Sequence, residues 1–170
     1  MTIYKRLFLF LLFICVVGAW TAHSQTSVLT QHNDLDRIIL NNQESILNKK
    51  NVNNPSFGEI FSRTVDDQIY AHPLIVSKVN IPANGTKNIV VVATVNNTVY
   101  AYDADSANIS APYWQNNLTP TGSRVIKNRD MTGACGGNYK DFSGNMGIVG
   151  TPVIDSVTNT IYLVARSVTI

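Results

Sequence analysis

One segment of this chain occurs twice, and each copy is a β-branched run centred on a proline. Residues Ile69–Val76 (IYAHPLIV) match Ile148–Asp155 (IVGTPVID) at an offset of 79 residues. A second pair, Ile89–Thr94 and Ile161–Arg166, follows at an offset of 72 residues. Repetition at this period, in units of about four short strands, is typical of proteins built from successive antiparallel β-sheets. The sequence therefore predicts an all-β fold.

Turn residues divide the region of the first copy into four predicted strands. They are rich in β-branched and aromatic residues and span Ile69–Val76, Ile89–Val95, Thr98–Asp103 and Tyr113–Leu118. Residues 80–87 contain a proline and an Asn-Gly pair, which predicts a loop between the first two strands. Asn96 and Asn97 form a two-residue connection between the next two, because asparagine tolerates a positive φ in tight hairpins. These four strands are expected to form one antiparallel sheet.

Side chains alternate along a β-strand, so the third predicted strand should present two different faces. Val99 and Ala101 share one face, and Tyr100 and Tyr102 share the other. With Tyr113 and Trp114, these tyrosines could form a sugar-stacking platform. Aromatic rings bury a large apolar area, and this favours packing between sheets as their role.

The whole sequence divides into segments of different composition. The predicted boundaries are 1–24 for a signal peptide, 25–56 for a lead-in of loops, 57–118 for the first β-unit, 119–146 for a glycine-rich loop and 147–170 for the start of a second unit. The lead-in could hold one helical turn at residues 44–48. Residues 58–65 are predicted to form a further strand that closes another unit.

The N-terminus predicts export from the cytoplasm. Lys5 and Arg6 precede an apolar run from Leu7 to Trp20, and small or polar residues follow up to a predicted cleavage site near Gln25. The apolar run is shorter than the ~20 residues that a membrane-spanning helix needs, which favours a cleaved signal-peptide helix over an anchor. We expect a secreted or periplasmic protein with no stable membrane span. Without Lys5 and Arg6, 11 basic residues balance 11 acidic ones, which argues against nucleic acid as a partner.

Two motifs resemble a known repeat family. Thr98–Asp105 (TVYAYDAD), preceded by Val90–Ala93, is similar to the hairpin of pyrroloquinoline-quinone-type β-propeller repeats. Gly147–Asp155 together with Thr160–Ala165 resembles the start of the next repeat. The similarity begins at about Val52. It implies a four-stranded antiparallel propeller blade at 57–118 and a truncated second blade at 147–170, so that the chain would be the N-terminal fragment of an incomplete quinoprotein-like β-propeller.

The resemblance carries a fold and leaves the function open, because the family includes quinone-dependent alcohol dehydrogenases, outer-membrane assembly scaffolds and other exported proteins. The dehydrogenases share a vicinal cysteine pair, a calcium-binding set of acids and amides, and a catalytic Asp. After signal cleavage this chain has one cysteine and no recognisable match to the rest. We therefore expect a non-catalytic binding or scaffold module for a protein or glycan, with no catalytic or metal-binding residue and no assigned cofactor-binding residue. The alternative is a truncated quinone-dependent oxidoreductase, in which missing blades would supply the site for pyrroloquinoline quinone and calcium.

Local candidates for a site are few. Cys135 lies in the glycine-rich segment Gly133–Gly137, where it could form a disulfide with a residue beyond position 170 or belong to a ligand loop. Asp103 and Asp105 could be half of a calcium loop, but aspartates at a strand end favour a turn. His72 has no histidine at ligand spacing, which favours a structural role.

Four Asn-x-Ser/Thr triplets match the N-glycosylation pattern, which matters only in a eukaryotic secretory pathway. They begin at Asn84, Asn96, Asn108 and Asn117. Such matches also arise by chance in an asparagine-rich chain. For Asn96 the simpler role is backbone geometry in the tight turn.

Overall fold

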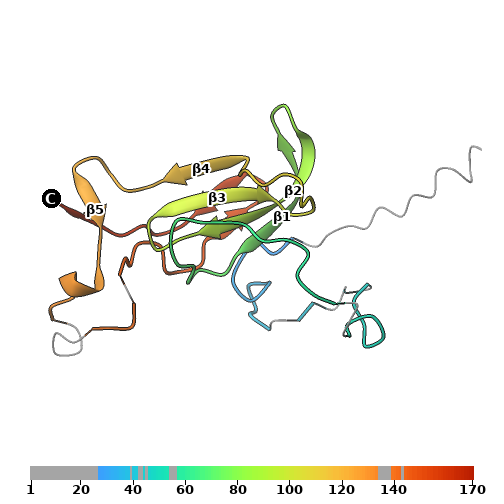
Figure 1. Ribbon diagram of the computed structural model, residues 1–170, viewed down its shortest axis with the longest axis horizontal. Helices are drawn as coiled ribbons and strands as arrows, with labels where there is room; N and C mark the ends of the chain where they lie inside the picture. Colours follow the sequence, from blue (N-terminus) through green and yellow to red (C-terminus); the bar gives the residue numbers. More distant parts are fainter. Residues whose placement is uncertain are drawn as a thin grey trace, which may run out of the picture.

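The protein is built around one antiparallel sheet of four strands (Figure 1). The computed structural model describes residues 27–38, 40–41, 44, 46–53, 57–133, 139–142 and 144–170. The strands are β1 (Leu74–Ile81), β2 (Gly85–Ala93), β3 (Thr98–Asp103) and β4 (Trp114–Asn117), in the order β1-β2-β3-β4. The predicted all-β class and the predicted antiparallel sheet are confirmed. Within the described residues there is no α-helix, and no helix is long and apolar enough to cross a membrane.

The first hairpin differs from the prediction at both of its ends. Residues 80–87 are not a loop, because β1 and β2 continue to a short turn and pair as far as Ile81 and Gly85. Ala83 and Gly85 take positive φ values of 64° and 74°, which let the chain reverse in so few residues. At its other end β1 begins at Leu74 instead of Ile69, directly after Pro73, which lacks a backbone N–H for pairing.

The second hairpin has a longer connection than predicted. β2 ends at Ala93, and the N–H of Thr94 donates to the carbonyl of Thr98 at 2.9 Å, so the connection comprises residues 94–97. Asn97 takes a φ of 60°, which fits the predicted tolerance of asparagine for this conformation. The fourth strand lies within one residue of its predicted ends.

Two small sheets follow, and one of them lies in a predicted loop. β6 (Val153–Asp155) and β7 (Thr160–Tyr162) form a hairpin, and β7 covers only the first part of the repeated segment Ile161–Arg166. β5 (Ser123–Val125) pairs with the C-terminal β8 (Ser167–Thr169). The predicted loop 119–146 therefore contains a strand and also the 3-10 helix η1 (Asn128–Asp130). Its local sequence has little strand character, and the partner 44 residues away supplies the pairing.

Two other expected elements are absent from the described residues. Residues 58–65 form no strand, and residues 44 and 46–48 belong to no helix. Residues 62–68 instead cross the tyrosine face of the sheet. The hydroxyl of Tyr102 donates to the Thr64 carbonyl at 2.7 Å, and the N–H of Asp66 donates to the hydroxyl of Tyr100 at 3.2 Å. Side chains thus satisfy backbone groups that a strand partner would otherwise bind.

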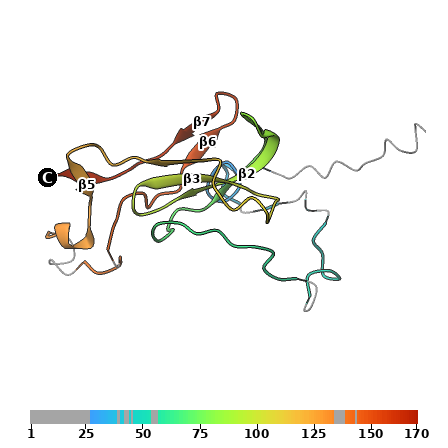
Figure 2. The ribbon, with the colours of Figure 1, turned by 45° about the horizontal axis from the view of Figure 1, so that its top comes forward.

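The core lies on the opposite face of the sheet. Leu74, Val91, Val99 and Ala101 are at most 3% exposed, and they form one cluster with Ile148 and Ile154. Ile154 belongs to β6, so the β6–β7 hairpin covers this face (Figure 2). The predicted alternation is confirmed, because Val99 and Ala101 pack in this cluster while the tyrosines contact residues 62–68.

A short N-terminal segment joins the two sheets. Val28 exchanges two backbone hydrogen bonds with Ile75 at the outer edge of β1, and the carbonyl of Leu29 accepts the N–H of Ile154 in β6 at 2.8 Å. We call residues 27–29 the N-terminal clip. The lead-in, which was predicted to be mostly loop, thus makes an isolated β-bridge and a link to the second sheet.

Candidate functional site

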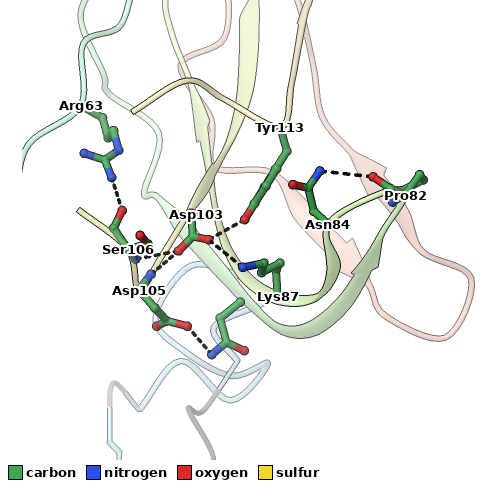
Figure 3. A network of polar contacts seen from close by, with 9 residues as sticks. Arg63, Pro82, Asn84, Lys87, Asp103, Asp105, Ser106 and Tyr113 are labelled. Carbon is green, nitrogen blue, oxygen red and sulfur yellow. Dashed lines mark hydrogen bonds and ion pairs between the residues drawn. The ribbon is translucent and has the colours of Figure 1, made fainter. Parts of the chain in front are cut away.

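A polar cleft of about 530 Å³ opens at the C-terminal end of β3 (Figure 3). It lies between the bulged part of β1, the start of β2 and the loop that leaves β3. The lining residues are Lys78, Thr86, Lys87, Asn88, Asp103, Asp105, Ser106, Ala107 and Asn108. Amine, carboxylate, amide and hydroxyl groups therefore meet in one space.

Asp103 organises the loop side of this cleft. One oxygen of its carboxylate accepts the backbone N–H groups of Asp105 and Ser106 at 2.8 and 2.7 Å, which closes a turn directly after β3. The other oxygen accepts the hydroxyl of Tyr113 at 2.5 Å and lies 3.8 Å from the Lys87 ammonium. The prediction that Asp103 and Asp105 form a turn is confirmed by this geometry.

The contacts of Asp103 set its pKa and that of Tyr113. Burial alone would raise the pKa of Asp103, but the Tyr113 hydroxyl, the two N–H groups and the Lys87 charge together hold it below its ordinary value. Burial and the hydrogen bond to Asp103 raise the pKa of Tyr113 to about 12. At neutral pH the carboxylate is therefore charged and saturated with donors, which makes it a poor general base and a good structural anchor.

Asn88 ties the two walls of the cleft together. Its side-chain oxygen accepts the backbone N–H of Lys78 at 3.0 Å, and its side-chain nitrogen donates to the Asp105 carboxylate at 2.9 Å. Lys78 has a φ of 59° and lies at the irregularity in the pairing of β1 with β2, between Val76 and Val79. Bulges of this kind redirect side chains. No local sequence signal predicts this arrangement, because the presence of a lysine in a strand does not reveal its φ.

The chemistry that this cleft offers is hydrogen bonding. The described residues include no group of three or more His, Cys, Asp or Glu that could hold a metal ion. Lys78 and Asn108 are exposed at the rim, while Asp103 is only 2% exposed. A polar ligand could thus meet donors and acceptors whose positions are fixed by Asn88 and Asp103.

A second polar cluster surrounds Asp66 at the other end of β3. Its carboxylate accepts side-chain hydrogen bonds from Thr94 and Asn96, both at 2.8 Å, and from Thr98 at 2.5 Å. Partial burial raises the pKa of Asp66, but these hydrogen bonds outweigh it and leave the pKa below its ordinary value. We call these four residues the Asp66 cluster.

The chain packs closely beside the Asp66 cluster. Asn97 is fully buried, and its side-chain nitrogen donates to the Arg166 carbonyl at 3.0 Å and to the Ser167 hydroxyl at 3.1 Å. The N–H of Gly147 donates to the Val95 carbonyl at 2.8 Å. A Cβ atom at Gly147 would overlap the side-chain oxygen of Asn97. This end of β3 is closed by the C-terminal part of the chain.

The aromatic residues are used for packing. Tyr100 and Tyr102 stack with ring centroids 5.6 Å apart and are 4% and 3% exposed. They line a second cleft of about 440 Å³ together with Arg63 and Gln115. The rings are buried, so a packing role is confirmed for this pair, but they pack against residues 62–68 and not between two sheets as predicted. Trp114 is the exception, at 37% exposed.

The other predicted candidates lie apart from the cleft. Cys135 falls outside the described residues. The backbone N–H of His72 donates to the Thr151 hydroxyl at 2.9 Å, which joins the equivalent positions of the two repeats. Among the Asn-x-Ser/Thr triplets, Asn96 and Asn117 use their side-chain nitrogens in hydrogen bonds to Asp66 and to Thr98, whereas Asn108 is exposed at the cleft rim.

Comparisons of the chain with protein-family models, with curated proteins and with solved structures find no match.

Proposed function

We propose that this chain is an exported, non-catalytic binding or scaffold module. Its ligand would be a protein or a glycan that binds in the cleft at the C-terminal end of β3. The observation that carries the proposal is the arrangement around Asn88 and Asp103. Asn88 fixes both walls of a polar cleft, and Asp103 is too well bonded to act as a catalytic base. Donors and acceptors held in fixed positions suit the recognition of a polar ligand.

The repeated β-units support the architecture that goes with this function. A four-stranded antiparallel sheet is followed by a hairpin whose first strand starts after an equivalent proline, as in propeller repeats of the pyrroloquinoline-quinone type. In this proposal β1–β4 are a blade and β6–β7 begin the next one. The resemblance of the two motifs is the support for this assignment.

Export is part of the same proposal. Ser27 is part of the fold, because its hydroxyl accepts the N–H of Ser77 at 3.0 Å. Cleavage near Gln25 would leave this contact intact. We expect mass spectrometry of the secreted product to place the mature N-terminus within a few residues of Gln25, and a product that keeps the segment from Met1 to Trp20 would contradict export by cleavage.

Ligand binding can be tested on glycan and peptide arrays with the mature chain. The cleft variants are Lys78→Ala, which removes a charge at the rim, and Asn88→Ala, which removes the two side-chain hydrogen bonds that connect the walls. Lys140→Ala is the matched control, because Lys140 is exposed and does not line the cleft. We expect both cleft variants to lose binding while the control retains it. No binding on either array, or equal binding by all variants, would contradict the proposal.

The same preparation separates binding from redox catalysis. We expect the mature chain, titrated with pyrroloquinoline quinone and calcium, to show no saturable binding and no alcohol-dependent dye reduction. Saturable binding with dye reduction would support the alternative, a quinone-dependent oxidoreductase.

A further inference from the structure

The tip of the β1–β2 hairpin carries an Asn-Gly pair, which occurs once in the sequence, at Asn84 and Gly85. Residues 82–84 make the turn, and the pairing of the strands resumes where Gly85 faces Ile81. Residues 82–86 are all exposed. The pair thus lies at a loop tip, where changes to a chain are tolerated best, and Asn84 does not line the cleft.

Asn84 makes its contacts within its own turn. Its side-chain nitrogen donates to the Pro82 carbonyl at 3.2 Å (Figure 3), and its backbone N–H donates to the Ile81 carbonyl at 2.9 Å. Gly85 has a φ of 74°, and among the described residues nothing lies within 4 Å of the position that its Cβ would take. The side chain of Asn84 and the nitrogen of Gly85 are therefore neighbours in an open part of the surface.

The following residue decides whether an asparagine side chain can react with its own main chain. After Asn84 the attacking nitrogen belongs to glycine, so no side chain crowds its approach to the amide carbon. Asn108 is exposed as well, but the next residue is Ile109, whose branched Cβ restricts the chain and shields the nitrogen. Exposure is thus shared by both asparagines, whereas the unhindered following nitrogen belongs to Asn84.

We propose that Asn84 is a site of spontaneous deamidation and isomerisation in the folded protein. The Gly85 nitrogen bonds to the side-chain carbonyl carbon of Asn84, and the side-chain amino group leaves as ammonia with the proton of that nitrogen. Water then opens the five-membered succinimide. Cleavage of the new bond gives aspartate, and cleavage of the original peptide bond gives isoaspartate, in which the main chain runs through the side chain. Water is the only co-reactant.

The modification changes both the charge and the length of the main chain at the hairpin tip. Either product carries a carboxylate in place of a neutral amide, and isoaspartate adds one methylene group between the turn and β2. Thr86 and Lys87 follow directly and line the cleft, so one wall of the cleft would start from an altered turn. The reaction needs no ligand, so this proposal is independent of what the cleft binds.

Ageing of the folded mature chain tests the proposal directly. The chain is kept in mildly acidic and in mildly alkaline buffer, and ion-exchange chromatography separates species by charge. We expect a species with one additional negative charge, which forms several-fold faster in the alkaline buffer because the attacking nitrogen must lose its proton. Peptide mapping by mass spectrometry should place the change at Asn84, and isoaspartyl methyltransferase should label that peptide. Asn108 is the internal control and should stay unchanged.

Two variants and a denatured sample separate the folded turn from the bare sequence. Asn84→Gln keeps an amide but would have to close a six-membered ring, so the new species should be lost while the urea midpoint stays that of the wild type. Thr86→Ala keeps the Asn-Gly pair without the glycosylation triplet and should age like the wild type. An unchanged charge in the folded chain, conversion only after unfolding in urea, or equal conversion at Asn108 would overturn the proposal. A glycan on Asn84 in the protein from its native host would overturn it as well, because the amide nitrogen would then carry the sugar.

Discussion

Each end of β3 has an aspartate with several hydrogen-bond donors around it, but the two aspartates lie in different surroundings. At each end a carboxylate accepts several hydrogen bonds from hydroxyl, amide or backbone donors, and its pKa falls below the ordinary value. Asp66 is exposed and lines the second cleft, although Asn97 beside it packs tightly against Gly147, whereas Asp103 is only 2% exposed and lies at the back of the first cleft. The difference shows that a saturated carboxylate does not mark a functional site by itself. The two ends differ in the packing beside the carboxylate: at the Asp66 end Asn97 packs tightly against Gly147, and at the Asp103 end a cleft opens. We call these the closed end and the open end.

The largest effect is expected at the closed end, from Gly147→Ala. The new Cβ would overlap the side-chain oxygen of Asn97 and lie 2.6 Å from the Val95 carbonyl. Overpacking of this kind costs about 2–3 kcal/mol of the free energy of unfolding. Urea denaturation measures it, and Gly150→Ala is the matched control because nothing lies within 4 Å of its Cβ position. Equal stability of the two variants would show that this end is loosely packed.

Removing the carboxylate at the open end should cost somewhat less. Asp103→Ala leaves the Tyr113 hydroxyl and two backbone N–H groups without their acceptor, for a loss of about 2 kcal/mol. Asp103→Asn keeps an acceptor oxygen and should lose less, which separates hydrogen bonding from charge. Denaturation curves of both variants test this. A loss for Asn as large as that for Ala would point to the charge interaction with Lys87 as the main contribution.

Asp66→Ala should have a smaller effect than Asp103→Ala. The carboxylate of Asp66 is partly exposed, so water can replace the acceptor for Thr94, Asn96 and Thr98. We expect a loss of about 1 kcal/mol in the free energy of unfolding, as for an ordinary exposed hydrogen-bond acceptor. A loss equal to that of Asp103→Ala would remove the contrast between the two ends.

The smallest expected effect is a difference between the two ends in how the free energy of unfolding depends on pH. Both aspartates have lowered pKa values in the folded state, so the stability they add is present above pH ~4 and is lost as the pH falls through the folded pKa. Both ends also respond to base, because burial and the Asp66 charge raise the pKa of Tyr100, but the larger response is expected at Asp103. The pKa of Tyr113 is raised from 10.0 to about 12, so its contribution is complete below pH 10 and is lost between pH 10 and 12.

Tyr113→Phe isolates this alkaline contribution. Between pH 10 and 12 the wild-type chain should lose more stability in urea than the variant does, because phenylalanine has no hydroxyl to ionise against Asp103. Tyr70→Phe is the control, since Tyr70 is 45% exposed and its ring packs against Phe142. Parallel stability curves for wild type and Tyr113→Phe would contradict the assignment.

Local pattern was sufficient to predict the four-stranded sheet and the two faces of β3. Strand character, alternation and turn residues are properties of neighbouring amino acids, and they placed β3 and β4 almost to the residue. The pairing of β5 with β8 was missed because β5 is polar and gains its partner from a distant segment. For residues 58–65 the error was the opposite one: a strand was predicted from their sequence, but they pair with no strand, and residues 62–65 lie across a face of the sheet.

Only part of the candidate site could be predicted from the sequence. A turn at Asp103 follows from its place at the end of a strand, and the structure bears this out. The cleft depends on the bulge at Lys78 and on the reach of Asn88 across two strands. Neither can be derived from a lysine and an asparagine in a polar stretch. Long-range geometry, which sequence pattern does not record, supplied the rest.

The N-terminal clip has a consequence for the order in which the chain folds. The β1–β4 meander joins neighbouring segments and can form as soon as they are made. Leu29 and Ile154 lie near opposite ends of the described chain, so the clip must close a very long loop. Contacts of this separation form late in folding. The clip should therefore close last, after the second sheet has docked, and its few backbone bonds should be the first to exchange their hydrogens with solvent.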